Sequence, residues 1–251
     1  MTATAGVPYY YKGNGRLYFR PYATPSAPLI RLANVKELKV SIKEKTETLP
    51  DYDDPAGGVA AMASRIEDAQ IDLIIHDIQA PNLALALWGS ATDVAGTSVN
   101  DEAVSVYKGS LTCLARAGAT AVVVKSSDGT TTYAAGTDYQ VTGAGLLIPA
   151  TSSIADGASL KVSYTYPAQH QVEAMTGTGQ EVFLVCDGLN LAGNGRPRVV
   201  RLWRAKLKPA KEVDYINTDK FTELALSGSL LRDETRGDGL SKYFSETIVT
   251  A

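Results

Sequence analysis

The sequence predicts a mainly β protein in which a second, smaller β domain is inserted into the first. Polar and apolar residues alternate with a period of two along several runs, as they do in half-buried strands. Glycine is frequent, with 22 residues in a chain of 251, and long helical patterns are hard to find. The hydrophobic fraction of 45% is that of an ordinary globular protein, so either domain can bury a core.

A long hairpin is expected first. Its outgoing strand, within residues 35–47, carries on one face the apolar residues Leu38, Val40 and Ile42. The return strand, within residues 65–77, carries on one face Ala69, Ile71, Leu73 and Ile75. Each run of about 12 residues spans roughly 40 Å, about twice the usual strand length, which indicates an extended or shared sheet.

A flexible loop, TLPDYDDPAGGVAAMASR, is expected between these strands at residues 48–65. Its Asp51, Asp53 and Asp54 could ligate a hard cation such as calcium, which takes oxygen ligands. The spacing fits no EF-hand, because no Gly stands at the required offset and no Glu closes the loop. We therefore expect no metal here.

The rest of the first domain is expected to consist of a short helix and two more long strands. Residues 80–89, APNLALALWG, have a Pro near the start and a Gly just after the end, the asymmetry of a helix that covers a sheet. Residues 199–209 and 221–234 alternate like the first two runs. The first domain therefore resumes after an interruption.

The segment that interrupts the first domain has a different composition, rich in Ala, Gly, Ser and Thr. Its short strands are separated by turn signals such as Asp128-Gly129 and Asp156-Gly157. Turns at intervals of about a dozen residues are typical of a small β-sandwich. We expect the first domain in residues 1–96 and 169–251, and the inserted domain in residues 97–168.

From the net charge and from the few cysteine and histidine residues, we expect neither an enzyme nor a cofactor-binding protein. With 24 basic and 27 acidic residues the formal net charge is -3, so the whole chain is no electrostatic trap for nucleic acid or membrane. Cys113 and Cys186 are expected to be buried free thiols rather than a disulfide. With only His76 and His170 besides, neither a zinc cluster nor a histidine-activated nucleophile is expected. The chain also lacks an export signal and an apolar run of membrane-spanning length, so we expect a soluble protein.

Basic residues gather between positions 196 and 211. Arg204, Lys206 and Lys208 share one strand face, while alternation puts Trp203 on the other face with Ala205. A groove for nucleic acid would need the aromatic ring beside the charges. The pattern therefore favours a solvated or subunit-bridging face over a binding groove.

The order of these segments resembles the major tail tube protein of long-tailed bacteriophages. The resemblance is carried, over nearly the full chain, by GNGRLYFRPY, NVKELKVSIKEKTETLPDYDDPAGG, IEDAQIDLIIHDIQAPNLALALWG and TYAAGTDYQV…GLLIPA…ADGASLKVSYTYP. It implies a tail-tube-like β-sandwich or barrel subunit with a short flanking helix and an inserted Ig-like domain. Six such subunits would form a ring whose strands close into one barrel, and the rings would stack into a tube.

The resemblance also implies a structural role in the virion, with assembly in the cytoplasm of the bacterial host. The implied partners are further copies of the chain, the tape-measure, tail terminator and baseplate or tip proteins, and phage DNA that passes without specific recognition. No membrane, metal or cofactor is implied. Twenty-four strands about 4.8 Å apart give a circumference of about 115 Å and a diameter of roughly 37 Å, which passes a duplex of roughly 20 Å.

By resemblance, two groups of residues would make the contacts. The hairpin tip would reach the neighbouring ring through Asp51, Tyr52, Asp53, Asp54, Val59 and Met62. Polar strand faces would meet the lumen or another subunit through Glu37, Lys39, Lys43, Asp68, Asp72, Arg204, Lys206 and Glu223. Tubes of this kind usually have an acidic lumen, whereas these charges are mixed. The alternative is an adhesin-like or carbohydrate-binding module whose function lies in the inserted domain.

Overall fold

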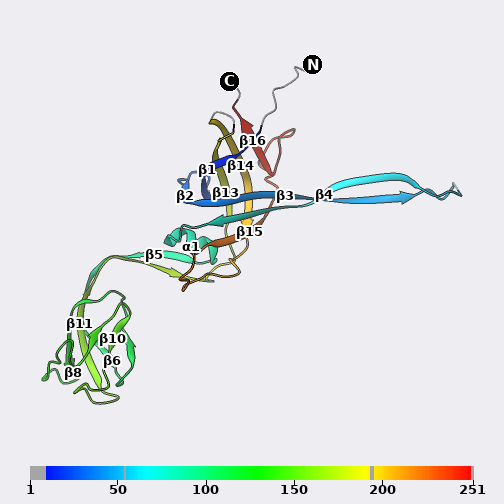
Figure 1. The fold of residues 1–251 in the computed structure, drawn as a ribbon. Coiled ribbons are helices and arrows are strands. Elements are labelled where there is room, and N and C mark those ends of the chain that lie inside the picture. Colours follow the sequence, from blue (N-terminus) through cyan, green and yellow to red (C-terminus); the bar gives the residue numbers. More distant parts are fainter. Residues whose placement is uncertain (1–9, 54, 193–194, 250–251) are drawn as a thin grey trace. The chain divides into compact units, whose positions relative to one another are not determined.

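The computed structural model describes residues 10–53, 55–192 and 195–249, and the chain divides into two compact units. Unit 1 comprises Met1–Ala91 and Val172–Ala251, and unit 2 comprises Thr92–Gln171. The described residues form sixteen strands and one helix, so the predicted mainly β fold is confirmed (Figure 1). The expected insertion, residues 97–168, falls inside unit 2.

Unit 1 is built on one antiparallel sheet whose strand order is β2-β1-β13-β14-β15-β4-β3, with β16 paired to β14. Its strands are β1 (Gly13–Pro21), β2 (Ile30–Leu32), β3 (Val35–Pro50), β4 (Val59–Ile75), β13 (Glu181–Asn190), β14 (Arg196–Leu207), β15 (Leu224–Leu230) and β16 (Phe244–Ile248). Four long runs were expected, but the sheet also includes β1, β2, β13 and β16, and β15 has only seven residues.

The core of unit 1 lies on one face of this sheet. Alternate residues of β4, Ala69 to Ile75, are buried as expected, and Leu73 is 1% exposed. They pack with alternate residues of the other strands, including Leu17, Leu184, Leu202 and Leu226. The alternation of apolar and polar residues therefore gives the sheet one buried face and one solvent-facing face, and the second is here called the outer face.

The helix α1 (Ala80–Ala86) covers part of the core with Leu85 and Ala86, as expected, although it ends before Gly89. Trp88 follows the helix with a φ of 52°, and the Gly89 N–H donates to the Ala84 carbonyl at 2.8 Å. This bond satisfies a helix-end carbonyl that would otherwise lack a donor. The Trp88 indole N–H donates to the Leu207 carbonyl at 2.9 Å, which ties the helix end to β14.

β3 and β4 are longer than expected, at 16 and 17 residues. Their ladder reaches Pro50 and Val59, so the expected 18-residue loop shrinks to residues 51–58. The prediction that Val59 and Met62 lie in a loop is wrong, because both lie in β4. Figure 1 shows β3 and β4 continuing side by side away from the rest of unit 1. This outer part, from Ile42 to Ile66, is called the arm below.

Unit 2 is a small two-sheet structure with a core of its own. One sheet has the order β6-β11-β8 and the other β7-β10-β9. Its strands are β6 (Thr97–Ser105), β7 (Leu111–Cys113), β8 (Thr120–Ser126), β9 (Gln140–Val141), β10 (Gly145–Leu147) and β11 (Ser159–Tyr166). The chain passes between the units through β5 (Ser90–Val94) and β12 (Gln169–Glu173), which pair with each other.

Two expectations about single residues are corrected. Both cysteines are free thiols, but neither is fully buried as expected, because Cys113 is exposed and Cys186 is half-buried. Trp203 does not lie on the face of Ala205, because β14 carries an extra residue where Val182 pairs with Ala205 and Leu184 pairs with Leu202. This bulge turns Trp203 toward the ring of Phe183, at 5.6 Å between centroids.

Candidate functional site

The arm carries an apolar stripe that continues the core face beyond the core. Along β3, Val40 and Ile42 face the core side. Further along the same side, Glu44, Thr46 and Thr48 pair with Ile66, Ser64 and Met62 of β4. Directly opposed residues share a face in an antiparallel ladder. Ile42, Met62 and Ile66 therefore form one stripe, here called the arm stripe. These side chains are 57%, 69% and 55% exposed.

A bulge in β4 is what puts the stripe on this side. Lys43 pairs with Asp68, but Glu44 pairs with Ile66, so Glu67 is an additional residue in β4. A regular ladder would have set Glu67 opposite Glu44 and turned Ile66 and the residues beyond it to the outer face. The Lys43 ammonium lies 2.6 Å from the Glu67 carboxylate at the bulge, and this hydrogen bond raises the pKa of Lys43.

The arm tip is a closed turn. The Asp51 N–H donates to the Gly58 carbonyl at 3.0 Å, and the Asp53 N–H donates to the Asp51 carboxylate at 2.9 Å. Asp51 therefore shapes the turn, while Tyr52 is 82% exposed. Asp54 lies outside the described residues. Of the six residues expected at a contact, Tyr52, Val59 and Met62 present large exposed side chains.

Five of the eight expected polar-face residues lie together on the outer face of the hairpin. They are Glu37, Lys39, Lys43, Asp68 and Asp72, and the ladder sets Lys39 opposite Asp72 and Lys43 opposite Asp68. The Lys39 ammonium lies 2.6 Å from the Glu37 carboxylate, and this hydrogen bond raises the pKa of Lys39. Cations and carboxylates therefore alternate on this face.

Small polar residues continue this face across the sheet. One row of pairs runs from Lys206 through Ser229 and Gln70 to Ser41. The next row runs from Ser227 through Asp72 to Lys39. Lys206 thus belongs to the same outer face as the hairpin residues. On this face the three lysines are matched in number by three carboxylates, and serine residues lie between them.

Arg204 and Glu223 occupy separate clusters. The Arg204 guanidinium hydrogen-bonds the Glu181 carboxylate at 2.7 Å, which raises the pKa of Arg204. Glu223 is 2.7 Å from the Lys36 ammonium, which lowers the pKa of Glu223, and 3.8 Å from His76. Arg204 lies in β14 two positions before Lys206, on the same face as expected, and Glu223 directly precedes β15. Each forms its ion pair apart from the hairpin residues.

β3 stands at one end of the strand order, and β4 is its ladder partner among the described residues. A strand in this position presents one row of backbone N–H and C=O groups that its own sheet does not use. With 16 residues, β3 is far longer than the short edge strands by which proteins usually limit such pairing. Its free edge is a place where another strand can add.

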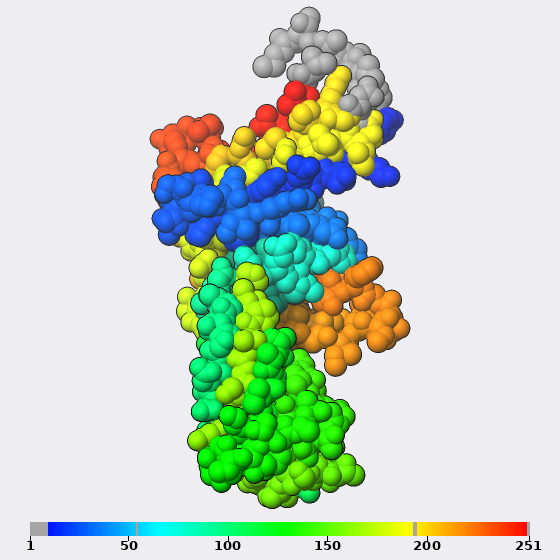
Figure 2. All heavy atoms as spheres, turned by 90° about the vertical axis from the view of Figure 1, so that its left-hand side faces the viewer, coloured from blue at the N-terminus to red at the C-terminus, as the bar shows by residue number. Residues whose placement is uncertain are grey.

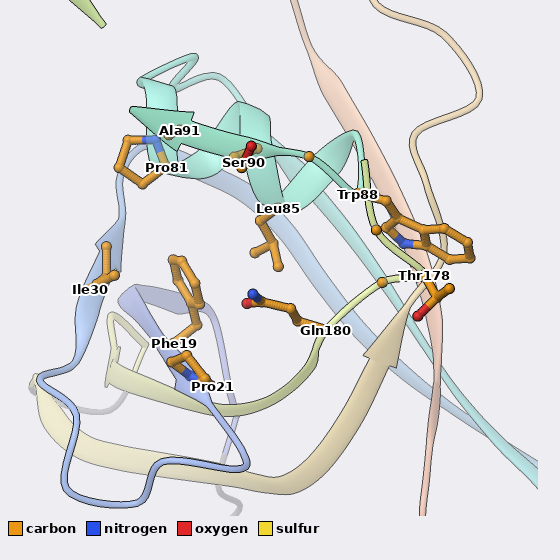
Figure 3. Close-up of a pocket in the computed structure, with 14 residues that line it drawn as sticks. Phe19, Pro21, Ile30, Pro81, Leu85, Trp88, Ser90, Ala91, Thr178 and Gln180 are labelled. Carbon is orange, nitrogen blue, oxygen red and sulfur yellow. The ribbon is translucent and has the colours of Figure 1, made fainter. Parts of the chain in front are cut away.

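Sequence reasoning missed a pocket beneath α1, about 460 Å³ in volume (Figure 3). Leu85 points from the helix toward Phe19 of β1 and toward the amide of Gln180. Phe19 and Leu85 are 4% and 8% exposed, so the pocket walls are continuous with the core. These residues are more than 60 positions apart in the chain, and no local pattern indicates that they meet.

The apolar residues of the segment between β14 and β15 were also missed. Tyr215, Ile216 and Phe221 are 78%, 92% and 89% exposed. They stand within a charged stretch, AKEVDYINTDKF, where no periodicity marks them as a group. The one signal in the sequence is that large apolar residues stand in an otherwise polar segment.

Within the described residues, no group of three or more His, Cys, Asp and Glu side chains is placed to hold a metal ion. In the same part of the chain, no helix combines the length and the apolar character needed to cross a membrane.

Comparison with known proteins places the chain in a family. A family model described as "Protein of unknown function UCP028589" matches residues 10–247. No curated protein matches the sequence. The match covers both units, so the two-unit chain as a whole is what the family shares.

Proposed function

The chain belongs to the family of proteins of unknown function UCP028589, and we propose that it is a structural subunit that assembles into stacked rings, the tail tube of a long-tailed bacteriophage. In this role it is a virion protein without enzymatic activity, and the tube is the conduit through which DNA enters the host cell. The observation that carries the proposal is the arm, whose apolar stripe lies beyond the core of its own subunit.

Contact with a partner would stabilise the long two-stranded arm. A two-stranded ribbon is marginally stable by itself in water. Fully burying a side chain such as Ile66 or Met62 contributes about 1.5–3 kcal/mol, and only part of this is gained while both side chains are more than half exposed. A neighbouring copy that covered the arm stripe would supply this burial. The tip residues Tyr52 and Val59 would then contact the adjacent ring.

The free edge of β3 supports the same proposal. When strands of neighbouring subunits join into one closed sheet, no edge is left for unwanted pairing. β3 is long enough to add to a neighbouring sheet over several residue pairs. The ring number we propose is six, as the resemblance implies, and the partners beyond the ring are those of a phage tail.

The outer face supports a role as channel lining. DNA binding is driven mainly by unpaired cations that displace counterions from phosphates. On the outer face the Lys39 and Lys43 ammonium groups are each 2.6 Å from a carboxylate, and Ser41, Ser227 and Ser229 separate the charged positions. A surface of this kind would let DNA slide without holding it.

Electron microscopy of the purified full chain tests the proposal. Negative-stain images and light scattering would be recorded over a range of protein concentrations in dilute salt. We expect ring-shaped particles and, at high concentration, stacked rings with an open centre. A chain that stays monomeric at every concentration would refute the proposal and would favour the adhesin-like or carbohydrate-binding alternative.

A further inference from the structure

The loop between β14 and β15 presents apolar side chains to solvent at one place. Ile216 and Phe221 are the most exposed large apolar residues of unit 1 among those described, at 92% and 89%. Figure 2 shows the loop as an orange lobe that projects from the surface. Single exposed apolar residues are ordinary on protein surfaces, but a projecting group of them marks an interaction site. Residues 214–222 are called the apolar loop below.

The apolar loop is held in one shape by its own hydrogen bonds. The Thr222 hydroxyl donates to the Asp214 carbonyl at 3.0 Å and so closes the base of the loop. Inside it, the Asn217 side-chain oxygen accepts from the N–H groups of Asp219 and Lys220 at 3.0 and 3.1 Å. A loop ordered in advance loses less conformational entropy when it binds. Its shape is therefore that of a preformed contact element.

The pocket beneath α1 has the matching chemistry. Phe19 and Leu85 form its apolar walls, and the Gln180 side chain extends toward both (Figure 3). None of the described residues that line it carries a charge. An apolar side chain can therefore enter without removing an ion from water, which would be costly. A volume of about 460 Å³ is in the range of pockets that take a group larger than one aromatic ring.

The pocket is also rigid on one side. The Trp88 indole is fixed by its bond to the Leu207 carbonyl, and a Cβ on Gly179 would lie 2.5 Å from the indole ring. Gly179 has a φ of +82°, which side chains other than glycine rarely adopt. Trp88 and the backbone at Gly179 are thus packed directly against each other at this side of the pocket.

We propose that the apolar loop of one copy inserts Phe221 and Ile216 into the pocket beneath α1 of the next copy. This inference rests on the self-assembly proposed above and names a contact within the ring. Because Ile216 and Phe221 are exposed in unit 1, the loop does not cover the pocket of its own chain. The contact joins two different surfaces of identical chains, which produces a closed ring or an open chain rather than a two-fold dimer.

Two variants of the full chain test this contact. The loop variant is Ile216→Ser with Phe221→Ser, and the pocket variant is Gln180→Trp, which fills the space between Phe19 and Leu85. Both variants, and the control described next, would also carry Met62→Thr and Ile66→Thr, so that stacking through the arm is removed equally from all three proteins. The matched control, Leu240→Ser, removes an apolar side chain that is 57% exposed at another surface.

Sedimentation velocity gives the result. We expect each variant alone to need at least about 30-fold more protein than the control for half-association, the effect of losing a central contact residue. An equimolar mixture keeps one intact loop and one intact pocket, so it should form a 1:1 dimer and stop there. That dimer would also show that both variants are folded.

Three outcomes would overturn the inference, and they are distinguishable. If the unaltered chain never associates, the proposed function fails and this contact fails with it. If the unaltered chain forms rings and the loop variant associates as the control does, only the loop-to-pocket contact is wrong. If the mixture forms no dimer, or grows beyond one, the two surfaces are not partners of each other.

Discussion

Glu44 on β3 lies opposite Ile66 on β4, because the additional residue Glu67 shifts the register of the arm by one position. A side-chain period of two means that such a shift decides which face every later residue occupies. Here it keeps Ile66 and Met62 in line with Val40 and Ile71 of the core face. With Glu67 present in the chain, the bulge is what keeps the stripe that we propose as an assembly surface on the core face.

Replacing Met62 and Ile66 by Thr is predicted to prevent stacking without unfolding the subunit. Both side chains are more than half exposed, so the free energy of unfolding of the monomer should change by about 0.5 kcal/mol or less. If each loses about 1.5 kcal/mol of burial between copies, association weakens by roughly 100-fold. Light scattering measures the association, and thermal unfolding at low concentration measures the monomer.

The matched control replaces Ala61 and Ala63 by Thr on the opposite face of the arm. Ala63 pairs with Glu47 and Ala61 with Leu49, so neither belongs to the arm stripe. This control should associate as the unaltered chain does. Equal weakening of both variants would mean that the arm acts through its strands as a whole rather than through the stripe.

Deleting Glu67 is predicted to impair stacking for a different reason. The deletion makes the ladder regular while Glu44 still pairs with Ile66 and Lys43 with Asp68, so the arm stripe keeps its face. What it removes is the local bend and added twist of a bulge, and so the direction of the arm. We expect a monomer of unchanged stability whose rings fail to stack in electron micrographs.

The variant Glu67→Ala serves as its control. It keeps the additional residue and removes only the ion pair with Lys43, which is exposed to solvent and therefore contributes little to stability. Stacking by this control but not by the deletion supports a role of the bulge in aiming the arm. Normal stacking by both would show that the arm tolerates either direction.

The sequence was informative where the ladder is regular and misleading where it is not. Alternation correctly identified Ile71, Leu73 and Ile75 as core residues, because β4 pairs with β15 without interruption over that stretch. The same rule placed Trp203 on the wrong face, because the bulge in β14 adds a residue beside Phe183. A bulge is chosen by pairing between distant segments, so one strand's sequence does not reveal it.

The candidate site was foreseen in part for the same reason. The exposed tip residue Tyr52 stands out by local composition, since Pro, Gly and Asp surround it. The pocket beneath α1 brings Phe19, Leu85 and Gln180 together from three parts of the chain, and only the tertiary fold creates it. Local patterns thus predicted elements and their faces, whereas concave sites required the arrangement of elements.

Removing the inserted segment is predicted to leave association intact. The deletion of residues 97–168 would join β5 to β12 by a short Gly-Ser turn, and these two strands already pair with each other. Asp93 and His170, whose side chains are 2.6 Å apart in this ribbon, would both be retained. Electron micrographs should show rings like those of the full chain. Loss of rings would place an assembly contact in unit 2.

Asp138 gives unit 2 a marker for acid sensitivity. Its carboxylate accepts hydrogen bonds from the Ala134 N–H at 2.9 Å and from the Ser153 hydroxyl at 2.7 Å. These bonds hold the pKa of Asp138 below its ordinary value of 3.8. A carboxyl group whose pKa is lower in the folded state stabilises that state above its unfolded pKa. This contribution is lost as the pH falls through 3.8 toward the lower folded value.

Asp138→Asn is therefore predicted to flatten the pH dependence of unit 2 selectively. Calorimetry follows both units, whereas tryptophan fluorescence follows unit 1 alone, because the two tryptophans, Trp88 and Trp203, both lie there. Between about pH 5 and pH 3 the unfolding midpoint of unit 2 should fall less in the variant than in the unaltered chain, since no carboxylate remains to be protonated. The fluorescence midpoint should shift equally in both proteins. Identical calorimetric slopes would show that Asp138 does not control the acid response, whatever its hydrogen bonds.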